Sequence, residues 1–395
     1  MTRPSVFSVV LLTVAVCAAA VTAEAAACDD SLQLYAWVSD AGVGGTINRV
    51  SPCTNQSTVV ATVPKDGPKI AGESTVVGPA NGAGVVVQDC SGQGRSAGAD
   101  TCCEEYWAPV QLSPAKGQQF VYYSWALRYR SCPATGSYAA SSSVKVVPVG
   151  FNYNGIGFTE AFLAHDPVKD TLWELLGNYG QSSPVLYVSP RSNVSQSNYV
   201  DLSACKHFPP NDMLTEPVSL FTVPSERAAY VGLYVCLDSS PCFEFYVTRV
   251  DMDTNECEFS RVINNENNGG LPYITAVWPN AGTHPTALNV LWLGDPGGYV
   301  NDVGAFSGVN MTGPWQGLWT EEYYSNGMLF DFGNAPGGWT PRSVLVSGDV
   351  ALVYGDSETL WVLDQGTPGA NSKMTALNTW QVPGLNCLGI IPSSA

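Results

Sequence analysis

Two stretches of this chain repeat one pattern: Thr46-Ile47-Asn48-Arg49-Val50 followed by Thr54-Asn55, and Val247-Thr248-Arg249-Val250 followed by Thr254-Asn255. The two copies lie about 200 residues apart, and each continues into a second segment that contains Val. Short β-branched runs that end in a polar turn are typical of antiparallel strands joined by a hairpin. The repeat therefore predicts a chain built from recurring β hairpins.

Further hairpin-like blocks give the repeat a period of roughly 57 to 60 residues. They begin near Leu186, Tyr246 and Leu360, with weaker ones near Ala126 and Val300. About four short strands fit in each unit, and about six units fit in the chain, which is the organisation of radial β architectures. The sequence thus predicts an all-β fold that is β-propeller-like, with six blades as the first expectation and seven as the next. The alternative is two β-sandwich domains divided near residues 264–270.

The composition describes a turn-rich and weakly charged protein. Of the 395 residues, 13% are charged, 45% are hydrophobic, 39 are Gly and 27 are Pro. This hydrophobic content excludes intrinsic disorder. The chain has 17 Lys and Arg against 34 Asp and Glu, a net charge of −17, which argues against nucleic acid as a partner because phosphates are bound by cations.

The first 25 residues resemble a secretory signal peptide. Arg3 precedes an apolar run over residues 6–21, and Ala23 and Ala25 provide the small residues of a cleavage site. Residues 26–395 are then expected to form a single all-β domain, closed near its termini if it is a propeller. No later stretch is long and apolar enough for a transmembrane segment. We therefore expect a secreted, extracellular protein; its oligomeric state is left open.

The cysteines are expected to form disulfides, because secreted proteins mature in an oxidising compartment. Cys17 leaves with the signal, so 11 of the 12 cysteines remain and one lacks a partner. Cys236 and Cys242 flank a hairpin-like loop and are predicted to pair. The adjacent Cys102 and Cys103 are expected to face different partners. Cys28 and Cys387 lie near the chain ends, so either is a candidate for a bridge across the ring closure.

Three Asn-x-Ser/Thr sequons begin at Asn55, Asn193 and Asn310. In a eukaryotic secretory pathway such sequons are acceptors for N-glycosylation, and used sequons lie at the surface. We expect at least one of them to carry a glycan.

Few residues suggest catalysis. The chain lacks a nucleophile-elbow, zinc-protease or phosphate-loop motif, so no cofactor is predicted. His165 and His284 are candidate general bases, although both lie in turn-like sequence. Glu105 and Glu321 stand beside aromatic residues, as the carboxylates of sugar-cleaving sites do. Adjacent glutamates on a strand point to opposite faces, so a site would need one Glu from each segment.

The segment Asp251-Met252-Asp253-Thr254-Asn255 alternates oxygen-bearing side chains, as the start of a calcium loop does. The glycine and the distal glutamate of such a loop are missing. Asp251, Asp253 and Asn255 are therefore candidate metal ligands, but a polar hairpin turn is favoured and no metal is predicted.

The sequence favours an extracellular binding or adhesion module that recognises a glycan or a protein. This expectation rests on the predicted fold and on the lack of catalytic motifs, and a fold alone does not determine function. One alternative is a glycan-processing hydrolase or lyase with its site in the central pocket. Another is a structural component of an extracellular coat or wall. The many aromatic residues either stack on a ligand or fill the seams between sheets, and packing is favoured.

Overall fold

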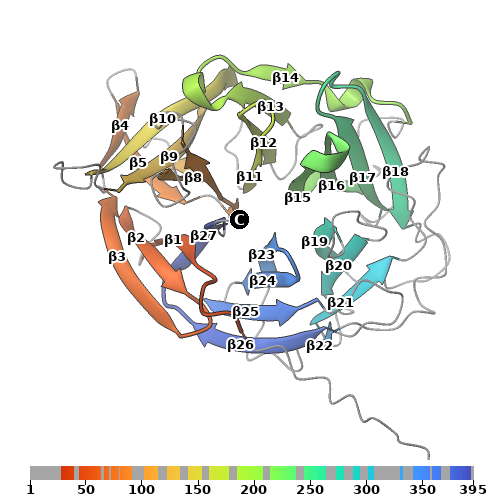
Figure 1. Cartoon of the computed structure of the whole chain (residues 1–395). Helices are drawn as coiled ribbons and strands as arrows, with labels where there is room; N and C mark the ends of the chain where they lie inside the picture. The colour runs from red at the N-terminus through yellow and green to blue at the C-terminus, as the bar shows by residue number, and fades with distance from the viewer. Residues whose placement is uncertain are drawn as a thin grey trace, which may run out of the picture.

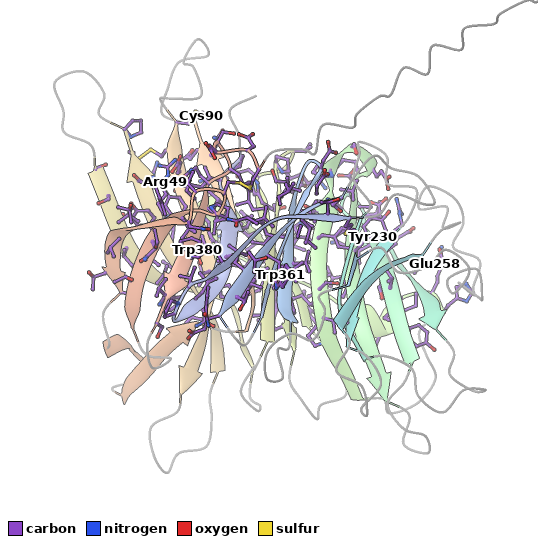
Figure 2. The ribbon with its side chains drawn as sticks, turned by 90° about the horizontal axis from the view of Figure 1, so that it is seen from below. Arg49, Cys90, Tyr230, Glu258, Trp361 and Trp380 are labelled. Atoms are coloured by element: carbon purple, nitrogen blue, oxygen red, sulfur yellow. A yellow bond between two sulfur atoms is a disulfide. The ribbon has the colours of Figure 1, made fainter. Side chains whose placement is uncertain are left out.

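The short apolar runs of the chain fold into antiparallel strands, and the strands form six sheets that are arranged in a ring (Figure 1). The computed structural model describes residues 28–39, 44–63, 66–70, 73–79, 81–90, 102–113, 122–133, 141–153, 160–177, 185–207, 214–236, 244–263, 273–279, 288–293, 301–306, 330–331, 341–355, 358–365 and 374–392. Figure 2 shows the ring from the side, with Cys90 near one of its two faces.

The first three sheets contain the N-terminal half of the chain and the last strand. Sheet A has the order β27 (Leu385–Ile390), β1 (Leu34–Val38), β2 (Gly45–Ser51), β3 (Gln56–Val63). Sheet B has the order β10 (Ser141–Tyr153), β9 (Tyr122–Cys132), β8 (Cys103–Ser113), β5 (Glu73–Pro79), β4 (Asp66–Ile70), and β7 (Val85–Asp89) also pairs with β8. Sheet C has the order β14 (Asn198–Val200), β13 (Val185–Pro190), β12 (Thr171–Gly177), β11 (Glu160–Asp166), β6 (Asn81–Ala83).

The other three sheets are four-stranded and follow the chain order. Sheet D contains β15 (Leu214–Val223), β16 (Ala228–Cys236), β17 (Glu244–Asp251) and β18 (Cys257–Ile263). Sheet E contains β19 (Tyr273–Pro279), β20 (Leu288–Leu293), β21 (Asn301–Phe306) and β22 (Phe330–Asp331). Sheet F contains β23 (Pro341–Ser347), β24 (Val350–Gly355), β25 (Thr359–Asp364) and β26 (Thr375–Gln381).

Helical structure in the described residues is limited to short 3₁₀ turns: η2 (Arg191–Asn193), η3 (Leu202–Ala204) and η4 (Pro224–Glu226). No helix among these residues is long and apolar enough to span a membrane. The predicted all-β propeller class is confirmed. The alternative of two β-sandwich domains is wrong, because the sheets follow one another around an axis rather than facing each other in pairs (Figure 1).

Sheet A buries both of its faces against neighbouring sheets. Along β1, Leu34 and Ala36 pack in a cluster with sheet F, whereas Tyr35 and Trp37 pack in a cluster with sheet B. Successive side chains of a strand point to opposite faces, so one short apolar run supplies the core on both sides. This explains why the strands look like continuous apolar runs in the sequence.

The aromatic residues of the described strands mostly fill these seams. The largest side chains that are fully buried include Trp37, Trp107, Trp173, Tyr35, Tyr106, Tyr230 and Tyr354. Each large ring removes much apolar surface from water, which is the dominant favourable term in folding. For these residues the packing interpretation is confirmed.

The turn at the end of the sequence repeat has the same conformation in both copies. Asn55 joins β2 to β3 and Asn255 joins β17 to β18, and their φ angles are +56° and +62°. Asn tolerates the left-handed region better than most residues, so it suits this hairpin position. The repeat seen in the sequence is thus a repeat in structure.

The ring closes through strand pairing. The last strand, β27, pairs antiparallel with the first, β1, and places Ile390 opposite Leu34. The hydroxyl of Tyr106 in sheet B donates a hydrogen bond to the carbonyl oxygen of Cys387 in β27. The first and last described strands thus lie side by side, but neither Cys28 nor Cys387 bridges the closure.

Four disulfides are present in the described residues: Cys28–Cys53, Cys90–Cys102, Cys103–Cys132 and Cys205–Cys257. The prediction that the adjacent Cys102 and Cys103 have different partners is confirmed. Cys387 is a free thiol and is buried. Cys242 lies outside the described residues, so the predicted Cys236–Cys242 bridge stays a prediction.

We predict that Cys387 is the one unpaired thiol of the mature chain and that it does not react in the folded protein. Burial raises the pKa of its thiol to about 12, so the reactive thiolate is scarce at neutral pH. Iodoacetamide should leave the native protein unmodified and should alkylate one thiol per chain in guanidinium chloride, with peptide mapping locating it at Cys387. Rapid alkylation of native protein would contradict this placement.

Candidate binding pocket

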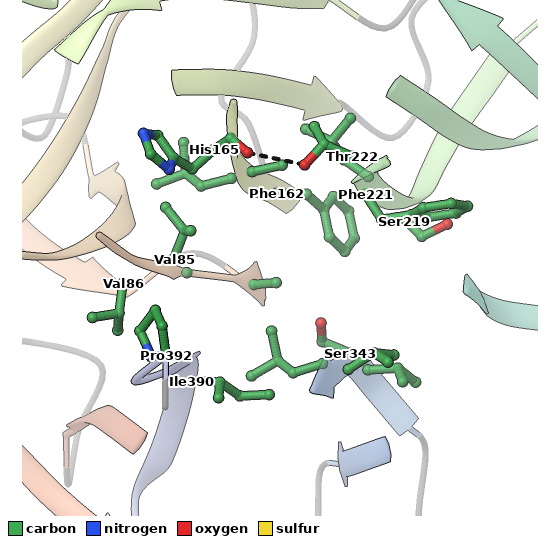
Figure 3. A pocket seen from close by; sticks show the side chains of 18 of the residues that line it. Val85, Val86, Phe162, His165, Ser219, Phe221, Thr222, Ser343, Ile390 and Pro392 are labelled. Carbon is green, nitrogen blue, oxygen red and sulfur yellow. Dashed lines mark hydrogen bonds between the residues drawn. The ribbon is translucent and has the colours of Figure 1, made fainter. Parts of the chain in front are cut away.

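A pocket of about 560 Å³ lies on the axis of the ring, bounded by strands from different sheets (Figure 3). Its walls come from β6, β7, β11, β15, β23 and β27. Of these strands, β11, β15, β23 and β27 lie toward the middle of the ring in Figure 1. Residues that are far apart in the sequence, such as Val85, Phe162 and Ile390, thereby line one cavity of the size that small-molecule sites have.

The described lining is largely apolar. It includes Val85, Val86, Phe162, Leu163, Val218, Phe221, Val344, Leu345, Val346 and Ile390. Its polar side chains are His165, Ser219, Thr222 and Ser343. A concave apolar wall with a few polar groups is typical of a ligand site, in which apolar contact gives affinity and the polar groups fix orientation.

Two of these polar residues occupy corresponding places in their sheets. Ser219 and Ser343 each follow a register shift in the first strand of their sheet, after Pro217 and Pro341 respectively, and each lies four residues before the end of that strand. Such bulges redirect side chains and are frequent beside functional sites. Neither serine is among the residues predicted from the sequence, although the sequence carries a signal for them, a Pro-x-Ser-aliphatic motif at Pro217 and again at Pro341.

His165 is the only candidate catalytic residue that the structure places in the described lining. It lies on β11, its side chain is 15% exposed, and its Nε2 is 3.1 Å from Oδ1 of Asp170. Burial lowers the pKa of His165, and this outweighs the opposite effect of the nearby Asp170 carboxylate. The imidazole is therefore neutral at pH 7, and it adds no charge to the pocket wall.

Behind His165 lies a charge cluster that we define as Asp89, Glu105, Arg130, Asp170 and Arg191. Arg191 begins η2 at the end of sheet C and reaches sheet B, where its Nη1 is 2.8 Å from Oε2 of Glu105. Its Nη2 is 3.3 Å from Asp89, and its Nε is 2.7 Å from Asp170. Burial works against the Arg191 charge, but hydrogen bonds to Asp170 and Glu105 prevail and raise its pKa. The cluster thus joins two neighbouring sheets.

Both carboxylate oxygens of Glu105 are contacted by donors within this cluster. Its side chain is 2% exposed, Arg130 approaches its other oxygen at 3.4 Å, and the indole of Trp107 donates to it at 3.3 Å. It does not line the described pocket. Its contacts fit a carboxylate that pairs buried arginines, rather than one that meets a substrate.

A second set of ion pairs joins sheets C and D. The guanidinium of Arg227, next to η4, forms two hydrogen bonds with the carboxylate of Asp166, at 2.7 and 2.9 Å. Asp253 accepts from Arg227 at 2.9 Å and pairs with Lys169 at 2.8 Å. Hydrogen bonds from Arg227 and Lys169 lower the pKa of Asp253 to about 2.

These contacts account for the candidate calcium loop. Asp253 faces Arg227 and Lys169, whereas Asp251 accepts hydrogen bonds from the backbone amides of Asp253 and Thr254. Asn255 takes the left-handed conformation of the turn. Across the part of the chain that is described, no group of three His, Cys, Asp or Glu side chains is placed to hold a metal ion. The geometry fits a polar hairpin turn.

The remaining candidates cannot be placed in the site. Glu321, His284 and the sequon residue Asn310 lie outside the described residues. Of the four catalytic candidates, the structure therefore places only Glu105 and His165. Arg191 contacts both Glu105 and Asp170, and Asp170 contacts His165, so the two candidates lie near each other. Glu105 belongs to the charge cluster, whereas His165 lines the pocket.

Comparisons with known proteins do not name a family. No known family model matches the chain, and no curated protein matches it. Among solved structures, it is similar to the Dos1 propeller, with 9% identity, a TM-score of 0.41 and coverage of 89% of this chain and 88% of that one.

A hydrazine synthase of Kuenenia stuttgartiensis has 12% identity and a TM-score of 0.37, with coverage of 87% of this chain and 80% of that chain. A prolyl endopeptidase structure has 10% identity and a TM-score of 0.35, with coverage of 93% of this chain and 50% of that chain. Likenesses of this degree carry no argument about function.

We predict that Arg191 stabilises the fold. Replacing it by Met (R191M) leaves the buried carboxylate of Glu105 without its closer arginine and leaves Asp89 with Arg130 but without Arg191, so the free energy of unfolding should fall by about 3 to 5 kcal/mol. Arg49 is the matched control, because its side chain is 43% exposed and its nearest contact to Glu104 is 3.7 Å. The R49M change should cost less than about 1 kcal/mol. Urea unfolding measures both, and equal losses would contradict a structural role for the cluster.

We also predict an acid dependence of stability that arises at His165. Its folded pKa lies below 6.5, so the unfolded chain takes up a proton first as the pH falls through 6.5. The stability that neutral His165 contributes to the fold is thus complete above pH 6.5 and is lost as the pH falls below the lowered pKa of the folded state. Urea unfolding between pH 7.5 and 5 should show a weaker decline in H165Q than in the wild type. The H207Q control, at a side chain that is 71% exposed, should retain the wild-type decline.

Proposed function

We propose that this protein is a secreted extracellular binding module whose ligand occupies the axial pocket. The observation that supports it is the pocket itself, a cavity of about 560 Å³ on the axis with an apolar wall and few polar groups. Binding in such a cavity is driven by removal of apolar surface from water. The wall favours a protein ligand that inserts an apolar group over a glycan, because sugars need many hydrogen-bonding partners.

The chemistry of the described lining does not favour the hydrolase alternative. Two convergent carboxylates are the requirement for glycoside cleavage, and no carboxylate is found in that lining. His165 is engaged by Asp170, and Glu105 is engaged by two arginines. The alternative of a disulfide-linked coat component gains nothing from Cys387, because this free thiol is buried.

The proposal includes an exported and glycosylated chain. Asn55 and Asn193 are both exposed, as used sequons must be, and the four disulfides fit an oxidising compartment. We also propose that the ring has six blades, one for each sheet.

Binding screens with pocket variants test the proposal. The mature chain would be presented to an array of defined extracellular proteins and to a glycan array, and each ligand found would be retested with V346W and F221A. Val346 and Phe221 line the pocket, so filling the cavity or removing its wall should weaken binding at least tenfold. The V59W control carries the same Val-to-Trp change on a side chain that is 59% exposed in β3, and it should bind normally.

Thermal unfolding of each variant separates a binding defect from misfolding, because an overpacked core loses stability. The proposal fails if both arrays give no ligand. It also fails if every ligand binds V346W and F221A as tightly as it binds the wild type.

A further inference from the structure

The strands on the outside of the ring differ in how their free edges are protected (Figure 1). A free edge can pair with another chain, and natural proteins prevent this with Lys, with Pro, with very short strands or with a covering segment. In sheet B, β10 contains Lys145 and Pro148, and β4 contains Pro68 and Lys69. In sheets C and E the outer strands, β14 and β22, have only three and two residues.

The outer strand of sheet D, β18, is covered by another part of the chain. The backbone of Lys206 hydrogen-bonds with that of Cys257 and Phe259, and the Cys205–Cys257 disulfide holds this segment in place. The outer strands of sheets A and F lack such protection. β3 and β26 have eight and seven residues, and neither contains Pro or a charged residue. No described strand or bridge pairs with their outer edges.

The first half of β3 is the most exposed part of these two edges. Residues Gln56–Val59 are all exposed, and Val59 is 59% exposed. The second half is better covered, because Val60 and Ala61 pack in the cluster shared with sheet B. Most residues of β3 are Val or Thr, which favour extended backbone. An uncharged edge of this composition is a template on which a second copy of the chain could pair.

The sequon residue Asn55 adjoins both edges. It directly precedes β3, and its Oδ1 accepts a hydrogen bond of 2.8 Å from Nδ2 of Asn378 in β26. The same Nδ2 also donates to the carbonyl oxygen of Pro52. A carbonyl can only accept, so this contact identifies the Asn378 group as the donor and the Asn55 atom as Oδ1. Nδ2 of Asn55, the atom that bears the sugar in an N-glycan, makes no hydrogen bond with a described residue.

We propose that Asn55 carries an N-glycan that covers the free edges of β3 and β26 and so keeps the protein monomeric. This inference rests on the export and glycosylation that the proposed function includes, and it gives the modification a residue and a role. A glycan is bulky and strongly hydrated, so it prevents a second chain from reaching the backbone of β3. The sequon at Asn193 has no such place, because the outer strand of its sheet is the short β14.

The modification itself is the transfer of a preformed sugar. Nδ2 of Asn55 forms a bond with the anomeric carbon of an oligosaccharide that is linked to a lipid diphosphate. The bond from that carbon to the diphosphate breaks, the lipid diphosphate leaves, and the nitrogen gives up one proton. The secretory pathway of a eukaryotic cell supplies this donor.

Substitutions of Ser57 test the proposal, because they change the sequon and leave Asn55 in its left-handed conformation. The S57A variant removes the sequon. The S57T variant is the matched control, since Thr keeps both the sequon and the hydroxyl that accepts from Asn48 at 2.8 Å. Each full chain would be secreted from eukaryotic cells. Peptide mass mapping should locate a glycan at Asn55 in the wild type and in S57T, and should find none there in S57A.

Sedimentation equilibrium then measures self-association. The wild type and S57T should be monomers at every concentration, whereas the average mass of S57A should rise toward that of a dimer as the concentration increases. Adding V59K to S57A should restore the monomer, because a charged side chain on an edge opposes pairing. S195A makes the same Ser-to-Ala change in the sequon of Asn193, and it should remain monomeric. Wild-type protein whose glycan is removed enzymatically in the native state should associate as S57A does, which excludes misfolding as the cause.

Three results would overturn the inference: a bare Asn55 in the secreted wild type, a deglycosylated protein and an S57A variant that both stay monomeric, or equal association of S195A and S57A. None of them bears on the axial pocket, whose lining contains no residue of β3 or β26. The binding function is judged separately by V346W and F221A. If the chain is not exported, the inference fails together with the exported and glycosylated part of the proposed function.

Discussion

The pairing of β27 with β1 is the constraint on which the rest of the structure depends. Sheet A buries apolar side chains on both of its faces, so it needs a neighbour on either side, and a linear array of such sheets would leave two faces exposed. A ring removes this problem when its last strand joins its first sheet. The pairing of Ile390 with Leu34 does this through backbone hydrogen bonds, and the hydroxyl of Tyr106 adds a bond from the neighbouring sheet. The same closure brings Ile390 and Pro392 to the pocket wall.

The few charged residues are used to join sheets. Arg191 connects sheet C to carboxylates of sheet B, and Arg227 connects sheets C and D through Asp166 and Asp253. Apolar seams determine which faces pack but allow them to slide, whereas bidentate guanidinium–carboxylate pairs have a fixed geometry. Burying such charges is costly, so the intact pairs add little net stability, whereas removing one partner leaves a buried charge uncompensated and destabilises the fold. We regard their main effect as setting the registry of the sheets.

The pocket is the product of packing that is incomplete at the axis. Strands from around the ring approach one another there, and valine, leucine and phenylalanine side chains leave a cavity between them. The bulges after Pro217 and Pro341 place serines in this otherwise apolar space. The positions of these two serines thus depend on local irregularities of the strands, while the apolar character of the wall depends on their regular alternation.

The sequence by itself determined the local structure. Residues close in the chain account for the Thr-Asn turns at Asn55 and Asn255, for the short apolar strands and for their repeat, because local conformational preference decides them. Spacing along the chain likewise accounts for the different partners of Cys102 and Cys103. Only the tertiary structure decided which distant residues meet. It paired Glu105 with Arg191, placed His165 rather than Glu105 at the pocket, and closed the ring with a strand instead of a disulfide. These outcomes depend on the packing of whole sheets, which no short stretch of sequence encodes.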